Sequence, residues 1–270
     1  MRLLFCGDIV GRSGREAVTG NVPGLRQKLE IDFVVANGEN AAGGFGITLD
    51  LAKELYAGGV DVITTGNHVW DQRQAIGQIA AEPRLLRPAN FPPGTPGRGA
   101  AVYTARNGRK VFVMNLMGRL FMDALDDPFQ AIERELRTQR LGAGGVDAIL
   151  VDIHAEATSE KMSVGHFCDG RVSLVVGSHS HVPTADAQVL PGGTAYQTDA
   201  GMCADYDSVI GMQKAAAVQR FVRKMPGEKL TAAEGPGTLC AVYVETDDKT
   251  GLAKRIAPLR IGGRLAPAMP

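Results

Sequence analysis

The sequence contains little cysteine, and the cysteines it has are not arranged in pairs. Among 270 residues there are four, at Cys6, Cys168, Cys203 and Cys240. Structural zinc sites and disulfide frameworks need closely or regularly spaced cysteines, so this distribution argues against both. We therefore expect a chain that works in a reducing compartment, the cytoplasm.

Long apolar runs and an excess of one charge are also missing. The apolar run near the start of the chain is broken by Gly7 and Asp8, too early for a signal peptide. Other apolar runs stay well below the roughly 20 residues of a membrane-spanning helix. Basic and acidic residues balance at 29 each, so no net field attracts nucleic acid or an anionic membrane. We expect neither partner, and a small anionic substrate would have to be bound by local charge.

What the sequence does have is an alternation of short apolar runs with amphipathic segments. The predicted strands are 3–6, 33–36, 62–65, 111–116, 148–153 and 173–176, and the predicted helices are 15–29, 49–57, 71–81 and 128–141. This alternation predicts a layered α/β protein with a largely parallel sheet, in one domain spanning 1–270.

Two stretches predict antiparallel hairpins, 101–116 turning at Asn107-Gly108 and 240–261 turning near 247–251. The Pro/Gly-rich stretch 87–99 predicts a surface loop, which we interpret as a candidate lid. The amphipathic stretch 214–222 predicts a helix that covers a sheet or, alternatively, forms a contact between subunits of a homo-oligomer.

Strong metal ligands follow the predicted strands in Gly-rich or polar turns. In open α/β sheets the carboxyl ends of the strands share an edge where ligands bind, so these turns should converge. The turns are Gly7-Asp8, Asn37-Gly38-Glu39-Asn40, Gly66-Asn67-His68, Asp152-Ile153-His154 and Gly177-Ser178-His179-Ser180-His181.

The convergent set mixes carboxylates, amide oxygens and four of the five histidines. Oxygen and nitrogen together suit zinc, manganese, iron or nickel better than calcium or copper(I). Seven or eight ligands exceed what one ion can use, which indicates two ions and a bridging carboxylate. Two ions roughly 3.5 to 4 Å apart bind a hydroxide between them and clamp phosphoryl oxygens, so we expect hydrolysis of phosphate esters.

Several residues near these turns permit two interpretations. Asp152 is either a partner that orients His154 or part of a buried salt bridge. Asp199, Asp205 and Tyr206 line the cleft or are ordinary loop residues. Trp70 stacks on a base or packs in the core, the more common role, and we interpret His166 as non-catalytic.

The motifs together resemble a known family. Gly7-Asp8, Gly66-Asn67-His68 and Gly177-Ser178-His179-Ser180-His181 are similar to the signature of the calcineurin-like metallophosphoesterases. A closer resemblance, to the YmdB-like bacterial cyclic-nucleotide phosphodiesterases, rests on the stretches 8–11, 37–44, 65–71, 154–161 and 206–211.

The resemblance implies a four-layer α/β/β/α sandwich of two mixed sheets with a dinuclear metal centre. The two ions would be iron or manganese, divalent or of mixed valence. One would be bound by Asp8, Glu39, Asn40 and His181, and the other by Glu39, Asn67, His154 and His179. Glu39 would bridge the ions where the wider superfamily usually has Asp, and Val10 stands where it usually has His.

The implied reaction is hydrolysis of small phosphodiesters, with 2′,3′-cyclic nucleotides as the leading substrates. A hydroxide bridging the metals would attack phosphorus, and His68 would act as the general acid. Three alternatives remain open: a phosphomonoesterase or nucleotidase, a regulatory metal-binding protein with incidental turnover, and a mononuclear hydrolase of carbon–nitrogen or ester bonds.

Overall fold

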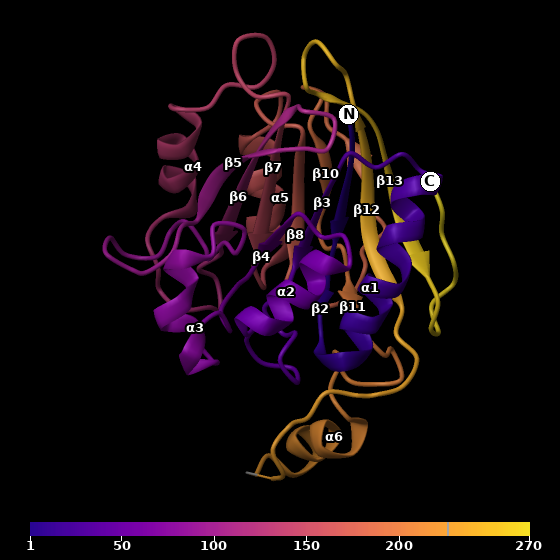
Figure 1. The fold of residues 1–270 in the computed structure, drawn as a ribbon. Coiled ribbons are helices and arrows are strands. Elements are labelled where there is room, and N and C mark those ends of the chain that lie inside the picture. Colours follow the sequence, from indigo (N-terminus) through magenta and orange to yellow (C-terminus); the bar gives the residue numbers. More distant parts are fainter. Residues whose placement is uncertain (226) are drawn as a thin grey trace.

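The fold is built around two β-sheets that pack face to face, as seen in the computed structural model, which describes residues 1–225 and 227–270 (Figure 1). The first sheet has the order β13-β12-β1-β3-β4, with strands Ala253–Ile261, Leu239–Thr246, Arg2–Cys6, Phe33–Asn37 and Val62–Thr64. The second has the order β5-β6-β7-β8-β10-β9, with strands Ala100–Thr104, Lys110–Met117, Ala148–His154, Leu174–Ser178, Ala195–Gln197 and Gln188–Val189.

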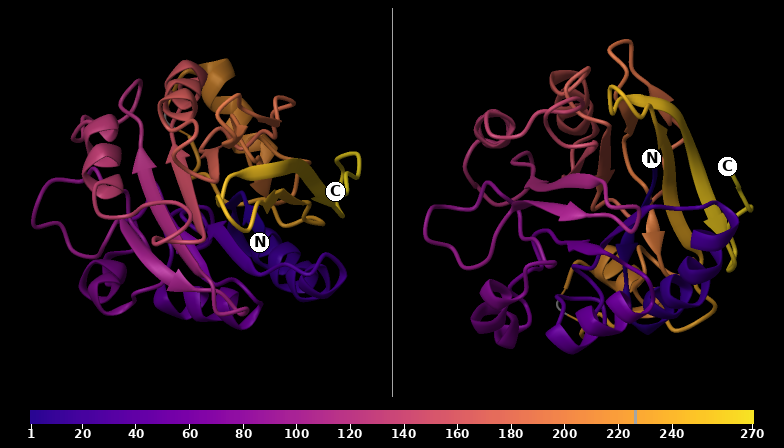
Figure 2. Two further views of the ribbon diagram at one scale, coloured as in Figure 1. Left: turned by 90° about the horizontal axis from the view of Figure 1, so that it is seen from above. Right: turned by 45° about the horizontal axis from the view of Figure 1, so that its top comes forward.

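Helices cover the outer face of each sheet (Figure 2). The first sheet is covered by α1 (Gly11–Lys28) and α2 (Leu49–Ala57), and the second by α4 (Pro128–Leu136) and α5 (Thr158–Phe167). Along β1, Leu3 and Phe5 pack between the sheets, whereas Leu4 and Cys6 pack toward the helices. A strand buried on both faces reads as a continuous apolar run, which explains why the sequence pattern located these strands.

The predicted four-layer α/β/β/α sandwich with two mixed sheets is confirmed. β1 runs parallel to β3 and antiparallel to β12, while β6, β7 and β8 run parallel beside antiparallel β5. Both predicted hairpins form, as β5 with β6 and β12 with β13. A small extra sheet that the sequence did not indicate pairs β2 (Asp8–Ile9) with β11 (Met202–Cys203).

The predicted helices need three corrections. The helix expected at 15–29 begins earlier, at Gly11, and the one expected at 71–81 divides into α3 (Arg73–Gln78) and a 3₁₀ turn (Ile79–Ala81). The helix expected to end at 141 ends at Leu136, where both the backbone N–H and the hydroxyl of Thr138 donate to the carbonyl of Glu135 and the i to i−4 pattern stops.

The proline-rich loop 87–99, the candidate lid, is held by contacts within itself. The side chain of Arg87 donates hydrogen bonds to the carbonyls of Pro88, Thr95 and Pro96, which fixes the loop on itself. The cavity beside the metal-ligand residues is lined by other segments.

The remaining helix, α6 (Lys214–Arg223), lies beyond the lower end of the sheets in Figure 1. It does not cover a sheet, which was one of the two expectations for this segment. Among the described helices, none is long and apolar enough to span a lipid bilayer.

Candidate metal centre

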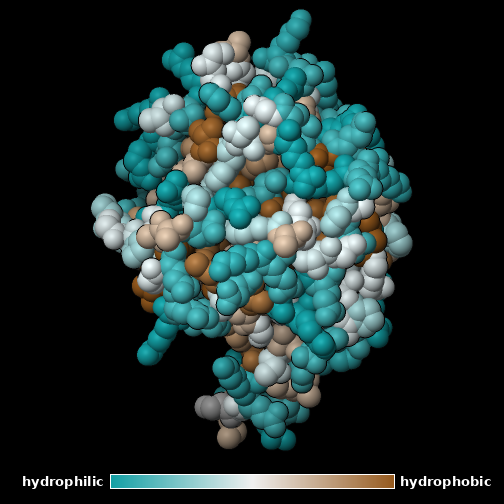
Figure 3. Space-filling model, viewed as in Figure 1, coloured by the Kyte–Doolittle hydropathy of each residue, from teal (hydrophilic) through white to brown (hydrophobic). Residues whose placement is uncertain are grey.

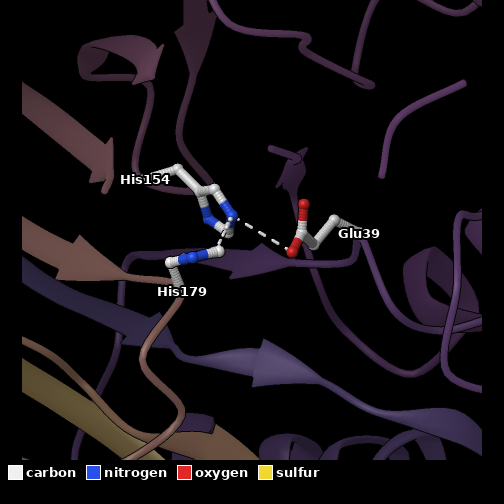
Figure 4. A group of neighbouring side chains, drawn as sticks. All are labelled: Glu39, His154 and His179. Carbon is white, nitrogen blue, oxygen red and sulfur yellow. Dashed lines mark hydrogen bonds and ion pairs between the residues drawn. The ribbon is translucent and has the colours of Figure 1, made fainter. Parts of the chain in front are cut away.

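The predicted ligands meet where the strand ends of both sheets face each other. Asp8, Glu39 and Asn67 follow strands of the first sheet, and His154 and His179 end or follow strands of the second. The site therefore lies at the seam between the two sheets, and Figure 4 shows side chains from opposite sheets pointing toward one another.

One group of ligand atoms surrounds the Nε2 atom of His154. Glu39 Oε1 lies 3.1 Å from it, Asn67 Oδ1 3.0 Å and His179 Nδ1 3.0 Å. One ligand atom each from Glu39, His154 and His179 lies within 4.8 Å of the others. Gly66 permits this approach, because a Cβ atom there would stand 2.2 Å from the His154 ring and 2.4 Å from Glu39 Oε2.

A second group of ligand atoms uses the same glutamate. Asp8, Glu39 and His181 each offer one ligand atom within 4.8 Å of the others. The amide of Asn40 lies between them, with its nitrogen 3.1 Å from Glu39 Oε1 and 3.2 Å from His181 Nε2. Glu39 thus belongs to both groups, and all seven predicted ligand residues come together.

The residues present fit a bound metal. Asn40 Oδ1 is buried and has no hydrogen-bond partner within the described chain, and such an orphaned oxygen is costly unless something binds it. The single proton that His154 Nε2 can carry does not satisfy the lone pairs of Glu39, Asn67 and His179 that surround it. A cation accepts all of these lone pairs at once, and mixed nitrogen and oxygen donors are those of zinc, manganese and iron sites.

Burial and mutual contact also shift the pKa values of these groups. Burial opposes the charges of Glu39 and His154, but their contact outweighs it, so the pKa of Glu39 is lowered and that of His154 is raised. Burial and the neighbouring His154 lower the pKa of His179 to about 3, which leaves its imidazole neutral and able to bind metal. Burial raises the pKa of Asp8 to about 7, a shift that a nearby cation would oppose.

Each candidate ligand histidine has its other ring nitrogen occupied by a protein group. His154 Nδ1 lies 2.9 Å from Ser178 Oγ, and His181 Nδ1 lies 2.8 Å from the carbonyl of Ile210. His179 Nε2 lies 3.1 Å from the carboxylate of Glu156. Such partners fix the tautomer and the ring orientation of metal-binding histidines.

Asp152 acts on His154 through an intermediary. Its carboxylate accepts a hydrogen bond of 2.7 Å from Ser178 Oγ, and Ser178 in turn contacts His154 Nδ1. Asn37 and Thr64 also donate to Asp152. Of the two interpretations from the sequence, orientation of the histidine is therefore the one the contacts favour.

The turn that carries His179 and His181 is strained, since both residues have positive φ angles, 94° and 66°. Asp199 holds this turn by accepting hydrogen bonds from Ser180 N at 3.1 Å and Ser180 Oγ at 2.7 Å. Lys161 pairs with Asp199 at 2.8 Å, and both side chains are fully buried. Asp199 thus fixes the turn that carries the two histidines, and Lys161 holds Asp199 in place. The sequence had not indicated this role of Lys161.

His68 stands beside the ligands and at the edge of the cavity. Its backbone N–H donates to Glu39 Oε2 at 3.2 Å, its Nδ1 lies 2.8 Å from the carboxylate of Asp71, and its ring meets the ring of Phe45 edge to face at 5.2 Å. The sequence reasoning did not single out Asp71, although a position three residues after His68 in a turn is a usable signal.

Other residues considered from the sequence lie outside the ligand cluster. Trp70 packs against Phe91, with ring centroids 5.9 Å apart, which confirms the core role. The hydroxyl of Tyr206 lies 3.2 Å from the backbone carbonyl of His181 and 3.1 Å from that of Met202, and it can donate to either. His166 lies exposed on α5.

A cavity of about 280 Å³ opens beside the cluster. Its lining consists of Glu39, Asn40, Gly44, Phe45, His68, Glu156, His179, Ser180, His181, Ile210, Met212 and Leu230.

A four-layer α/β/β/α sandwich with carboxylate, amide and histidine ligands at its strand ends is the architecture of the metallophosphoesterases. Within that class, the chain belongs to the YmdB-like protein family, whose model matches residues 4–259. This confirms the family that the sequence motifs resembled.

Known proteins similar to this chain agree with that assignment. A 2′,3′-cyclic-nucleotide 2′-phosphodiesterase of Bacillus subtilis is 46% identical over 261 residues, 97% of each chain. A crystal structure of a hypothetical protein from Thermus thermophilus matches with a TM-score of 0.90 and 40% identity, covering 98% of this chain and 100% of that one. A structure described as a novel phosphatase of Mycoplasma pneumoniae matches at 0.89 with 30% identity, covering 97% and 93%.

Proposed function

We propose that this chain is a dinuclear metal-dependent phosphodiesterase that hydrolyses 2′,3′-cyclic nucleotides. The observation that carries the proposal is that Glu39 belongs to both groups of candidate ligands. A carboxylate has two oxygens and a full negative charge, so it can bind two cations that would otherwise repel each other. The B. subtilis relative, with its name and 46% identity, supports the substrate class.

The first ion would be held by Asp8, Glu39, Asn40 and His181, and the second by Glu39, Asn67, His154 and His179. Iron and manganese both suit this donor set. A pair of ions there would supply Lewis-acid polarisation of the phosphoryl oxygens and activation of water.

The chain's own groups then position the substrate and move the proton. Asp199, Ser178 and Glu156 keep the ligand histidines in place through the contacts described above. His68 protonates the departing ribose oxygen, and the carboxylate of Asp71 at its Nδ1 stabilises the charged imidazolium that performs this step.

The lining of the cavity favours a diester over a monoester. Among the described residues that form it, the titratable side chains are Glu39, His68, Glu156, His179 and His181, and there is neither Lys nor Arg. A phosphate monoester carries close to two negative charges at neutral pH and a diester one. Any second charge would have to be bound by the metal ions alone, without help from basic side chains, and on this basis we infer a preference for the singly charged diester.

Metal analysis together with a substrate panel tests the proposal. We expect about two ions per chain in protein purified without chelators, and faster turnover of 2′,3′-cyclic AMP and bis-p-nitrophenyl phosphate than of p-nitrophenyl phosphate. One ion per chain would favour a mononuclear hydrolase. Faster turnover of the monoester would favour a phosphatase.

A further inference from the structure

One side of the cavity is apolar and is supplied by segments that bear none of the candidate metal ligands. Phe45 comes from the Gly-rich turn after β3, and Ile210, Met212 and Leu230 come from the segments that flank α6. We call these four residues the apolar wall. Phe45, Met212 and Leu230 pack around Val10 in a small hydrophobic cluster, which holds the wall against the catalytic body.

The wall is tied directly to the candidate metal centre. The carbonyl of Ile210 lies 2.8 Å from His181 Nδ1, and the ring of Phe45 meets the ring of His68 at 5.2 Å. A substrate whose phosphate lies among the histidines therefore places its substituent within a few ångströms of the wall.

Ile210 adopts a backbone conformation that its side chain disfavours. Its φ angle is 48°, and a β-branched residue in the left-handed region is strained, whereas Gly or Asn is not. Its side chain is nevertheless 53% exposed at the mouth of the cavity. An exposed apolar side chain kept at a strained position points to a role in binding rather than in folding.

The charges around the cavity define what the wall can accept. Glu39 and Glu156 are the acidic members of the lining, and Lys and Arg do not occur in it among the described residues. A second phosphate at the wall, as in a polynucleotide or a nucleoside diphosphate, would find no basic side chain in the described lining. The wall suits an uncharged, flat and largely apolar group.

We propose that the apolar wall is the subsite for the nucleobase of a 2′,3′-cyclic nucleotide, an inference that rests on the proposed function. The base lies between the Phe45 ring and the aliphatic side chains of Ile210 and Leu230, with the cyclic phosphate at the metal centre. These side chains offer no hydrogen-bonding group to read the edge of a base. We therefore expect the adenine, guanine, cytosine and uracil cyclic nucleotides to be hydrolysed with similar kcat/KM.

The test compares 2′,3′-cyclic AMP with the 2′,3′-cyclic phosphate of methyl riboside, which has the same reacting group and no base. In Leu230→Ala and Ile210→Gly we expect the ratio of kcat/KM for cyclic AMP to kcat/KM for the base-free analogue to fall about 10-fold, within the range for loss of one base contact. Glycine accepts the backbone angle of Ile210, so the carbonyl contact to His181 is kept. Phe221→Ala, on the exposed side of α6, is the matched control and leaves both substrates unaffected.

Two kinetic outcomes would overturn the subsite. One is an equal fall for both substrates with normal metal content, which would make the wall a support of the metal centre. The other is wild-type protein that hydrolyses the base-free analogue as efficiently as the nucleotide.

Measuring the binding of adenosine distinguishes failure of the proposed base subsite from failure of the proposed function. If wild-type protein hydrolyses neither substrate, the proposed function is wrong, and calorimetric titration with adenosine still tests the wall. Weaker adenosine binding in Leu230→Ala and Ile210→Gly than in Phe221→Ala supports the subsite, and equal binding in all three overturns it.

Discussion

Two regions that both contribute to the cavity differ sharply in how they are held. The metal-ligand cluster is buried, with Asp8, Glu39 and His154 at most 1% exposed, and its members are linked by hydrogen bonds from two sheets. The α6 segment, residues 205–225 and 227–233, projects from the lower end of the molecule (Figure 3). On α6, Phe221 is 76% exposed and Val222 71%.

The attachment of the α6 segment is correspondingly local. An antiparallel bridge between Met212 and Ala232 closes its base, and Ala233 N donates to the carbonyl of Gly211 at 2.8 Å. Segments with few buried contacts open and vary at low free-energy cost, whereas buried networks do not. The comparison separates a cluster of candidate ligands held by buried strand ends from an α6 helix that is held mainly at its base. On the proposed function, the first region would fix the chemistry and the second would contribute to substrate preference.

The largest effect in the metal-ligand cluster is expected for Glu39→Gln. We expect kcat to fall roughly 1,000-fold and metal content to drop, because a neutral amide cannot balance two cations. Elemental analysis and assays with 2′,3′-cyclic AMP measure both effects. Glu30→Gln, an exposed control, should keep metal and activity. Retention of two ions and normal turnover in Glu39→Gln would contradict the bridging assignment.

His68→Ala tests the proposed general acid, which contacts both Glu39 of the ligand cluster and Phe45 of the apolar wall. We expect kcat for 2′,3′-cyclic AMP to fall about 100-fold, with a smaller loss for bis-p-nitrophenyl phosphate, whose leaving group needs no proton. Metal content should not change, because His68 is not among the ligands.

His166→Ala, at an exposed position on α5, is the matched control for that experiment. Equal losses on both substrates would reject the general-acid role. If turnover disappears but a cellular phenotype is kept, a regulatory role becomes the better account of the protein.

Asp199→Asn tests how much the buried ion pair of Asp199 with Lys161 contributes to the stability of the fold. Removing the partner of the fully buried Lys161 should lower the free energy of unfolding by about 3–5 kcal/mol. Urea denaturation measures this, and Lys161→Met combined with Asp199→Asn should recover part of the loss. The corresponding exposed pair in the α6 segment is Asp207 with Lys214, and Asp207→Asn should change stability little. Equal losses of unfolding free energy in Asp199→Asn and Asp207→Asn would show that the two regions do not differ in how firmly they are held.

Cysteine labelling compares the accessibility of the sheets with that of α6, and it is the prediction with the smallest expected effect on the protein. Burial raises the pKa of Cys6 to about 12 and that of Cys240 to about 11, so at pH 8 both remain protonated thiols, which are poor nucleophiles. A cysteine introduced by Phe221→Cys should react with iodoacetamide much faster, with fold and activity unchanged. Mass spectrometry reads the order of modification, and equal rates for native and introduced cysteines would show that the sheets open as readily as α6.

The parts of the site that the sequence could predict are those carried by strand ends. Asp8, Asn67 and His154 each follow or end an apolar run, and the geometry of parallel strands brings such positions together regardless of loop details. The supporting residues gave no comparable signal. Lys161 appears in the sequence as an ordinary helical lysine, and the carbonyl of Ile210 is a backbone group that every residue possesses.

By itself, the sequence determined a layered α/β fold and, through its motifs, the family and the set of candidate metal ligands, because hydrophobic periodicity and residue chemistry are local properties. Only the tertiary structure decided that Lys161 and Asp199 form a buried pair, that the carbonyl of Ile210 lies at His181 Nδ1, and that an apolar wall faces the histidines. These features depend on distances between segments far apart in the chain, and such distances are set by the packing of one sheet against the other.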